Sequence, residues 1–318
     1  MQLSKKLIAV MMVSLSIFTT ACKATSGSVG ELEKAQAESL KNYTKEIISD
    51  GGVYRNYKNT EELNRVSSWI KTQMNLFGIP CEYQNFQANN SNYRNVVCSL
   101  NVGKPKQVIV GAHYDVYGEQ EGADDNASGV AGVIETARIL AKEKQRLNHN
   151  IEFVYYTLEE PPYFKTDLMG SYIHAKSVSE NKKNIAGVYV LEMIGYFDED
   201  DTQTYPLGLG LFYPKHGNYI AAISNFSSRK LGKEYCKSMK ILNRLECEKL
   251  VGPSFIQGVD YSDHANYWKF DIPAIMITDT SFFRNYHYHT TGDNLSILDF
   301  NKMAHVVDGL TSHLIATQ

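Results

Sequence analysis

The sequence has 318 residues, of which 43% are hydrophobic and 21% are charged, an ordinary balance for a globular protein with a sizeable buried core. A chain of this length can hold one or two domains. The formal net charge is −3 and no run of Lys and Arg stands out, so we expect no nucleic-acid partner.

The first 21 residues are typical of a secretory signal peptide. Lys5 and Lys6 precede an apolar run over residues 7–18, which is too short to span a membrane. Small residues then lead to Cys22, which resembles the lipid-modified cysteine of bacterial lipoproteins. We expect residues 1–21 to be removed on export. The mature protein would stay in the bacterial cell envelope through a lipid on Cys22, or reach the periplasm or the medium after ordinary signal cleavage.

Four further cysteines form an even set, which is expected of disulfides in an oxidising compartment. They are Cys81, Cys98, Cys236 and Cys247. The simplest of the three possible pairings joins Cys81 to Cys98 and Cys236 to Cys247. Four buried thiols are the alternative.

The hydrophobic pattern predicts a single α/β domain over residues 31–318, after a linker at residues 22–30. Apolar residues at helical spacing predict helices from near residue 31 and at residues 61–77, 126–142, 169–179, 218–231 and 298–315. Continuous apolar runs predict buried strands at residues 108–112, 151–158, 185–191 and 273–278, and residues 81–100 are patterned as a hairpin or edge strands. This order favours a three-layer sandwich with a central, mostly parallel mixed sheet and helices on both faces.

Histidine and glutamate residues follow the ends of the four predicted buried strands. His113 follows the first, Glu159 and Glu160 the second, and Glu192 the third, while the loop after the fourth carries His289. Sites of open α/β sheets lie beyond the carboxyl ends of the strands, so we expect these side chains to meet at one edge. Imidazole nitrogen and carboxylate oxygen are zinc ligands. Two zinc ions need a shared carboxylate, and a further carboxylate must take the proton of the activated water.

Six short segments, in this order and spacing, resemble the co-catalytic two-zinc aminopeptidases typified by bacterial leucyl aminopeptidase. The segments are GAHYD from Gly111, GADDNASG from Gly122, LEE from Leu158, LEMIG from Leu191, SDH from Ser262 and YHTTGDN from Tyr288. The resemblance covers residues 54–310, nearly the whole expected mature chain. That family also includes glutamate-carboxypeptidase-like enzymes and glutaminyl cyclases.

The resemblance implies two Zn²⁺ ions per chain. The implied ligands are Asp124 as the bridging carboxylate, His113 and Glu192 on one ion, and Glu160 and His289 on the other. Glu159 is the implied general base for the metal-activated water. Many relatives carry Asp where this chain has Glu192, and the longer glutamate can ligate if the backbone recedes slightly.

The resemblance also implies supporting residues around the ligands. Asp115 would fix the tautomer of His113. Asp125, with Asn126, would hold the turn that presents the bridging carboxylate, and Asp263, with its neighbour His264, would support the site by hydrogen bonds. Aromatic residues close to the ligands suggest a wall of the substrate pocket, and they are Phe164, Tyr261, Phe283 and Tyr286. Tyr261 is also a candidate oxyanion donor.

We therefore expect a zinc-dependent aminopeptidase that hydrolyses amino-terminal residues from peptides through a two-metal-activated water. One alternative is a glutaminyl cyclase-like acyltransferase with a single zinc, against which the presence of His113 argues. A second is a non-catalytic binding module of the same fold, which would have lost some ligands. The sequence indicates neither the oligomeric state nor the preferred side chain of the substrate.

Overall fold

The structure is a computed structural model that describes residues 32–48, 51–206 and 208–317. The predicted signal peptide, residues 1–21, and the predicted linker, residues 22–30, lie outside these ranges. Leu32–Gln318 forms one compact unit. Within the described ranges, no helix is both long and apolar enough to cross a membrane.

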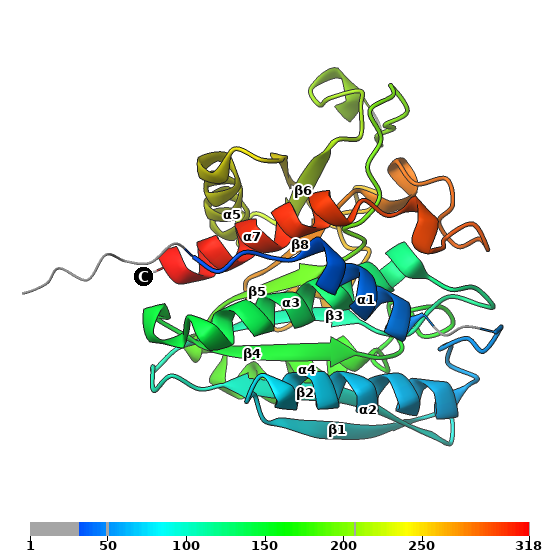
Figure 1. Cartoon of the computed structure of the whole chain (residues 1–318), viewed down its shortest axis with the longest axis vertical. Helices are drawn as coiled ribbons and strands as arrows, with labels where there is room; N and C mark the ends of the chain where they lie inside the picture. The colour runs from blue at the N-terminus through cyan, green and yellow to red at the C-terminus, as the bar shows by residue number, and fades with distance from the viewer. Residues whose placement is uncertain (1–31, 49–50, 207, 318) are drawn as a thin grey trace, which may run out of the picture. The chain divides into compact units, whose positions relative to one another are not determined.

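A mixed sheet of eight strands lies at the centre of this unit (Figure 1). The strands are β1 Cys81–Ala88, β2 Ser91–Leu100, β3 Gln107–His113, β4 Asn150–Tyr156, β5 Ile185–Leu191, β6 Tyr219–Ser224, β7 Glu246–Val251 and β8 Ala274–Thr278. Their order across the sheet is β1-β2-β4-β3-β5-β8-β6-β7. The central strands β4, β3, β5 and β8 are parallel to one another, whereas β2 and β6 pair antiparallel with their inner neighbours. The four central strands therefore end at the same edge.

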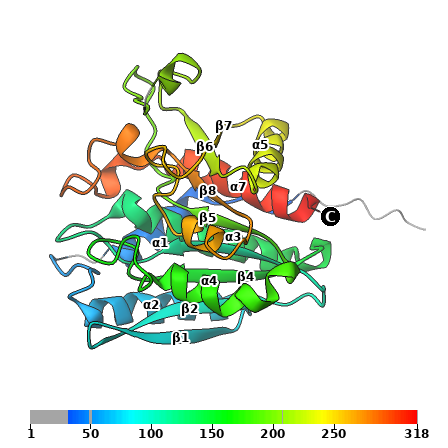
Figure 2. The same ribbon diagram turned by 180° about the vertical axis from the view of Figure 1, so that it is seen from behind.

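Helices cover both faces of the sheet, which confirms the predicted three-layer α/β architecture. One face carries α1 Ala37–Ile47, α2 Thr60–Leu76, α3 Gly129–Lys142, α5 Arg229–Leu242 and α7 Phe300–Ala316 (Figure 1). The other carries α4 Gly170–Val178 and the short α6 His264–Trp268, seen from behind in Figure 2. Side chains of the central strands are almost all buried, because helices exclude water from both faces of a parallel sheet.

Helix α2 shows how the sequence sets an element that packs on this sheet. The side chain of Asn59 caps its first turn by accepting a hydrogen bond from the backbone N–H of Glu62 at 3.2 Å. Val66, Ile70 and Met74 recur every four residues and are fully buried, so they form one apolar face. The prediction of a helix over residues 61–77 is confirmed within one residue at each end.

The prediction of a helix over residues 218–231 is wrong. Tyr219–Ser224 forms strand β6, and helix α5 begins only at Arg229 after a turn in which Asn225 accepts from the backbone N–H of Ser228. All six residues of the strand are buried. A short apolar run buried on both faces has no periodicity of its own, so its length and its β-branched content decide between helix and strand.

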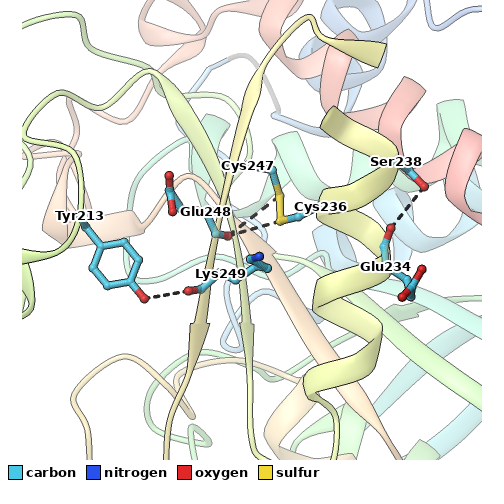
Figure 3. The surroundings of a disulfide bond; sticks show 7 residues. All are labelled: Tyr213, Glu234, Cys236, Ser238, Cys247, Glu248 and Lys249. Atoms are coloured by element: carbon cyan, nitrogen blue, oxygen red, sulfur yellow. Dashed lines mark hydrogen bonds between the residues drawn. A yellow bond between two sulfur atoms is a disulfide. The ribbon is translucent and has the colours of Figure 1, made fainter. Parts of the chain in front are cut away.

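Both simplest cysteine pairs are present in the structure. Cys81 pairs with Cys98 across the β1–β2 hairpin, and Cys236 on α5 pairs with Cys247 on β7 (Figure 3). Strand β7 lies at one edge of the sheet and pairs only with β6. The second disulfide therefore links this edge strand to the helix that covers it.

Candidate metal centre

Residues from three strand ends and two loops meet at the carboxyl edge of the central strands. His113 is the last residue of β3, and Glu192 directly follows β5. Glu160 lies four residues beyond β4, and His289 lies in the loop after β8. Asp125 comes from the turn before α3. The predicted meeting of these strand ends is therefore found in the structure.

These five side chains form two groups that share one carboxylate. His113, Asp125 and Glu192 make the first group, and Asp125, Glu160 and His289 make the second. One Asp125 oxygen, Oδ1, lies 3.3 Å from His113 Nε2, and the other, Oδ2, lies 3.2 Å from His289 Nε2. Asp125 thus presents one oxygen to each group.

The separations between neighbouring ligand atoms fit tetrahedral zinc better than direct hydrogen bonds. His113 Nε2 lies 3.4 Å from Glu192 Oε2, and His289 Nε2 lies 3.3 Å from Glu160 Oε2. A charge-assisted N–H···O bond is shorter, about 2.7–2.9 Å. Two ligand atoms each about 2.05 Å from a tetrahedral zinc lie about 3.3 Å apart. All four separations lie within 0.1 Å of that value.

Several polar atoms of the groups are buried without a hydrogen-bond partner in the described part of the chain. They include both ring nitrogens of His113, Nε2 of His289 and Oε1 of Glu160. A buried polar atom without a partner is costly, so its retention indicates a missing ligand. Imidazole nitrogen and carboxylate oxygen are the donors that zinc takes. The residues present therefore fit two zinc ions.

Asp125, and not Asp124, occupies the shared position, which corrects the prediction for the bridging carboxylate. The two oxygens of Asp124 are already occupied, since Oδ1 accepts from the backbone N–H of Gly195 at 3.0 Å and Oδ2 from the Asn285 side chain at 2.8 Å. Burial, with the neighbouring carboxyl of Asp279, raises the pKa of Asp124 well above its usual range. A protonated or shared carboxyl is a poor zinc ligand. The hydrogen bonds of Asp124 instead hold the turn that carries Asp125.

The turn that presents Asp125 is held by two further side chains that the sequence analysis did not single out. The carboxylate of Asp293 accepts from the backbone N–H groups of Asp124 and Asp125 at 2.7 and 3.0 Å. Buried Arg55 donates to the carbonyl oxygens of Glu121 and Gly122. The only available signal for Asp293 was its place in the last motif.

Glycine is required at residue 122 of the same turn. Its φ of +59° lies in the left-handed region, and a Cβ there would collide with the Val116 side chain and the Asp125 carbonyl. A larger residue would therefore displace the Asp125 backbone.

Glu192 is oriented by hydrogen bonds from Ser262 and Asn126. The Ser262 hydroxyl donates to Glu192 Oε2 at 2.6 Å, and the Asn126 amide lies 3.5 Å from the same oxygen. The Asn126 side chain also donates to the Leu191 carbonyl at 2.9 Å and accepts from the Met193 N–H at 3.0 Å. The segment after β5 is therefore fixed to the turn that carries Asp125.

Asp115 lies between the first histidine and the segment after β4. Its Oδ1 lies 3.5 Å from His113 Nδ1. Its two oxygens also accept from the backbone N–H groups of Glu159 and Glu160, each at 3.2 Å. Since Nε2 of His113 faces the shared carboxylate, Nδ1 is the nitrogen left for Asp115.

The predicted hydrogen bonds from Asp263 and His264 to the ligands are not found among the described residues, whereas their neighbour Ser262 donates to Glu192. Neither Asp263 oxygen has a hydrogen-bond partner among the residues described. Burial raises the pKa of Asp263 to about 7, against the attraction of His113. Nε2 of His264 lies 2.9 Å from the Val259 carbonyl, away from the ligands.

A cavity of about 430 Å³ opens beside the two groups. Its wall includes Glu159 and three of the four aromatic residues predicted for the pocket, Phe164, Tyr261 and Phe283. The fourth, Tyr286, does not line it and is 76% exposed. Tyr288, two residues further on in the same loop, lines the cavity instead.

Tyr288 is a cavity residue that the sequence analysis missed. Its ring stacks on the adjacent His289 with centroids 3.7 Å apart. Burial, followed by the charges of Asp125 and the nearby glutamates, raises the pKa of Tyr288 well above its usual range. The phenol therefore stays protonated and can donate a hydrogen bond beside the ligands.

Residues 95–313 match the sequence pattern of peptidase family M28, a range that spans well over half of the chain. The chain belongs to peptidase family M28. It is therefore a member of a family of hydrolases that act on peptide bonds.

Known M28-like proteins agree with this assignment. The chain is 37% identical over 270 residues to the uncharacterized protein YfbL of Escherichia coli strain K12, covering 82% of each chain. It is 26% identical over 220 residues to leucine aminopeptidase 1 of Trichophyton rubrum, covering 65% of this chain and 53% of that protein, so it spans about half of the fungal relative. Its fold matches the LapA aminopeptidase of Legionella pneumophila with a TM-score of 0.71 and 19% identity, over 88% of this chain and 71% of that one.

Proposed function

We propose that this M28 protein is an exported, zinc-dependent aminopeptidase with two Zn²⁺ ions per chain. Asp125 would bridge the ions, with His113 and Glu192 on one and Glu160 and His289 on the other. The observation that carries the proposal is the pair of ligand groups sharing Asp125, with ligand atoms at zinc-like separations. The ions, when bound, would acidify a water molecule and polarise the scissile carbonyl.

Glu159 is the proposed general base. It lines the cavity beside the ligands and belongs to neither group. Burial raises the pKa of Glu159 well above its usual range, which favours a carboxylate that accepts a proton and returns it. Its backbone N–H donates to Asp115, which supports a fixed position. Glu159 would take a proton from the attacking water and deliver it to the leaving amine.

Tyr288 is the proposed hydrogen-bond donor to the oxygen of the tetrahedral intermediate. A neutral phenol beside four carboxylates supports this role, because donors aimed at developing negative charge lower the barrier. Tyr261, the earlier candidate, is 37% exposed and its ring lies 4.3 Å from the Lys165 ammonium. It is better suited to the mouth of the cavity.

Export is supported by the amino-terminal pattern and by the disulfides. Two disulfides within one domain suit an oxidising compartment. Cleavage after residue 21 and a lipid on Cys22 remain part of the proposal for an envelope location.

The test of the function is peptide-terminus profiling with the purified mature protein loaded with zinc. A mixture of defined peptides should lose residues from the amino terminus, and a chelator should stop the reaction until zinc is restored. Loss from the carboxyl terminus would show the opposite polarity. Cyclisation of amino-terminal glutamine, with one zinc per chain by elemental analysis, would support a glutaminyl cyclase instead.

The same assay tests the base. Glu159→Gln should retain its zinc content and lose at least about 100-fold in turnover. Glu61→Gln, on the exposed first turn of α2, is the matched control and should hydrolyse normally. Near-normal turnover by Glu159→Gln would reject this assignment.

A further inference from the structure

The cavity beside the metal centre continues along the sheet to strand β7. Its lining includes Thr278 on β8, Ala221 on β6 and Glu248 on β7. These three residues are cross-strand partners, since Glu248 pairs with Ala221 and Ala221 pairs with Thr278. Neighbouring strands are about 4.8 Å apart, so the Glu248 backbone lies about 10 Å from Thr278 along this row.

The near end of the row adjoins the metal ligands. Strand β8 pairs with β5, and the backbone N–H of Glu192 donates to the Ile277 carbonyl at 2.9 Å. One face of the sheet therefore connects the predicted ligand Glu192 to Glu248. A side chain entering the cavity from the metal centre would run toward Glu248.

The far end of the cavity is walled by tyrosines around Glu248. Tyr205, Tyr213 and Tyr219 all line it. Tyr205 stacks on Tyr213 with centroids 5.6 Å apart, and its hydroxyl lies 2.7 Å from that of Tyr219. Burial, followed by the Glu248 charge, raises the pKa of Tyr213, as expected for a close carboxylate.

Glu248 itself lacks a partner in the described ranges of the chain. The tyrosine hydroxyls bond elsewhere, since Tyr213 donates to the Lys249 carbonyl at 2.7 Å and Tyr205 to the Pro214 carbonyl at 2.5 Å. No Lys or Arg described here forms an ion pair with Glu248 within 4.0 Å. Lys249, the next residue, also contributes to the cavity wall, where its carbonyl accepts from Tyr213. Its side chain alternates to the other face of the strand, and Figure 3 shows it away from Tyr213.

The strand that carries Glu248 is fixed from two sides (Figure 3). The Cys236–Cys247 disulfide ties β7 to α5, and its Cys236 sulfur lies 3.6 Å from the Glu248 carbonyl oxygen. Tyr213 holds the strand from the cavity side through Lys249. A carboxylate on a rigid element is placed well enough to discriminate between substrates.

We infer that Glu248 selects peptides with a cationic amino-terminal residue, Arg or Lys, by pairing with its charged end. This inference rests on the proposed aminopeptidase function and names its substrate class. The methylenes of such a side chain would pack on Ala221, Ile223 and Met276, which line the same face. Its charged end would reach the Glu248 carboxylate between aromatic rings, a setting that suits guanidinium in particular.

The test compares the zinc-loaded wild type with Glu248→Gln on arginyl and leucyl p-nitroanilides, which carry only one amino-acid side chain. The wild type should prefer the arginyl substrate in kcat/KM, and the variant should lose at least about tenfold of that preference, since a hydrogen bond to a charged group contributes about 1.5–3 kcal/mol. Glu246→Gln, an exposed carboxylate on the same strand outside the cavity lining, should keep the preference within about twofold.

A binding measurement separates this inference from the proposed function. Calorimetry of the Glu159→Gln protein with the peptides Arg-Ala-Ala and Leu-Ala-Ala should show tighter binding of the first, and Glu159→Gln/Glu248→Gln should remove the difference. If this binding difference is found but the wild type hydrolyses no peptide, the specificity of Glu248 is supported and the peptidase function is rejected. A leucyl preference that Glu248→Gln leaves unaltered, or selection of a basic residue only at the second position, would overturn the inference.

Discussion

Ser262→Ala should weaken one zinc site and spare the other. The Ser262 hydroxyl donates to Glu192 Oε2 at 2.6 Å, and both side chains are buried, with 2% and 7% exposed. The remaining donor to this oxygen, the Asn126 amide, lies 3.5 Å away and is too distant to compensate. Alanine would therefore leave Glu192 without its main orienting contact.

The expected loss of zinc affinity follows from the negative charge on the Glu192 acceptor. A hydrogen bond to a charged group contributes about 1.5–3 kcal/mol, and each 1.4 kcal/mol corresponds to about a tenfold change in affinity. We therefore expect the site of His113 and Glu192 to bind zinc about 10–100-fold more weakly, the range usual for loss of a ligand's supporting partner. The site of Glu160 and His289 has no contact with Ser262 and should keep its affinity.

The assay is a zinc titration in competition with a chromophoric chelator, which resolves the two binding steps. Ser67→Ala, which removes a fully buried serine on α2, controls for general loss of stability. Equal weakening of both binding steps, or no change in either, would show that the Ser262 hydroxyl does not orient Glu192 for zinc binding.

Two other residues give independent predictions. Tyr288→Phe should lower kcat about 100-fold with little change in KM, because it removes a donor used in the transition state; unchanged kcat would exclude that role. His313 is buried against Tyr189, 2.7 Å from its hydroxyl, and burial lowers its pKa to about 4. In the unfolded chain His313 binds a proton with a pKa near 6.5, whereas in the folded protein it stays neutral until about pH 4. As pH falls from 6.5 to 4, the free energy of unfolding should therefore drop by about 3 kcal/mol. Denaturant titrations should find a smaller drop in His313→Gln, and identical pH profiles would contradict this.

The sequence was sufficient for the parts of the site that follow directly from strand ends. His113, Glu160, Glu192 and His289 were all predicted from their positions after apolar runs, and the structure brings them together. The extra methylene of Glu192 is accommodated, since its Oε2 reaches 3.4 Å from His113.

The choice between Asp124 and Asp125 could not be made from residue types. Adjacent carboxylates in a turn point in different directions, and the hydrogen bonds that decide the direction come from Gly195, Asn285 and Asp293. These partners lie 71–169 residues away along the chain, where no local pattern reaches.

The far end of the cavity could not be predicted from the sequence for a similar reason. Strand β7 reads ECEKLV, with charged residues at both faces, so its pattern favours no buried strand. Its place in the sheet depends on the register with β6, and β6 itself was predicted to be a helix. Glu248 therefore became a candidate only once the strands had been placed.

We propose that one carboxylate, that of Asp125, bridges two zinc ions. The most direct measurement is the zinc content of Asp125→Asn and Asp124→Asn after loading and exhaustive dialysis. We expect two zinc per chain in the wild type, loss of tight binding at both sites in Asp125→Asn, and binding that persists at both sites in Asp124→Asn. Two tightly bound ions in Asp125→Asn, with zinc lost from Asp124→Asn, would show that Asp124 and not Asp125 bridges the ions.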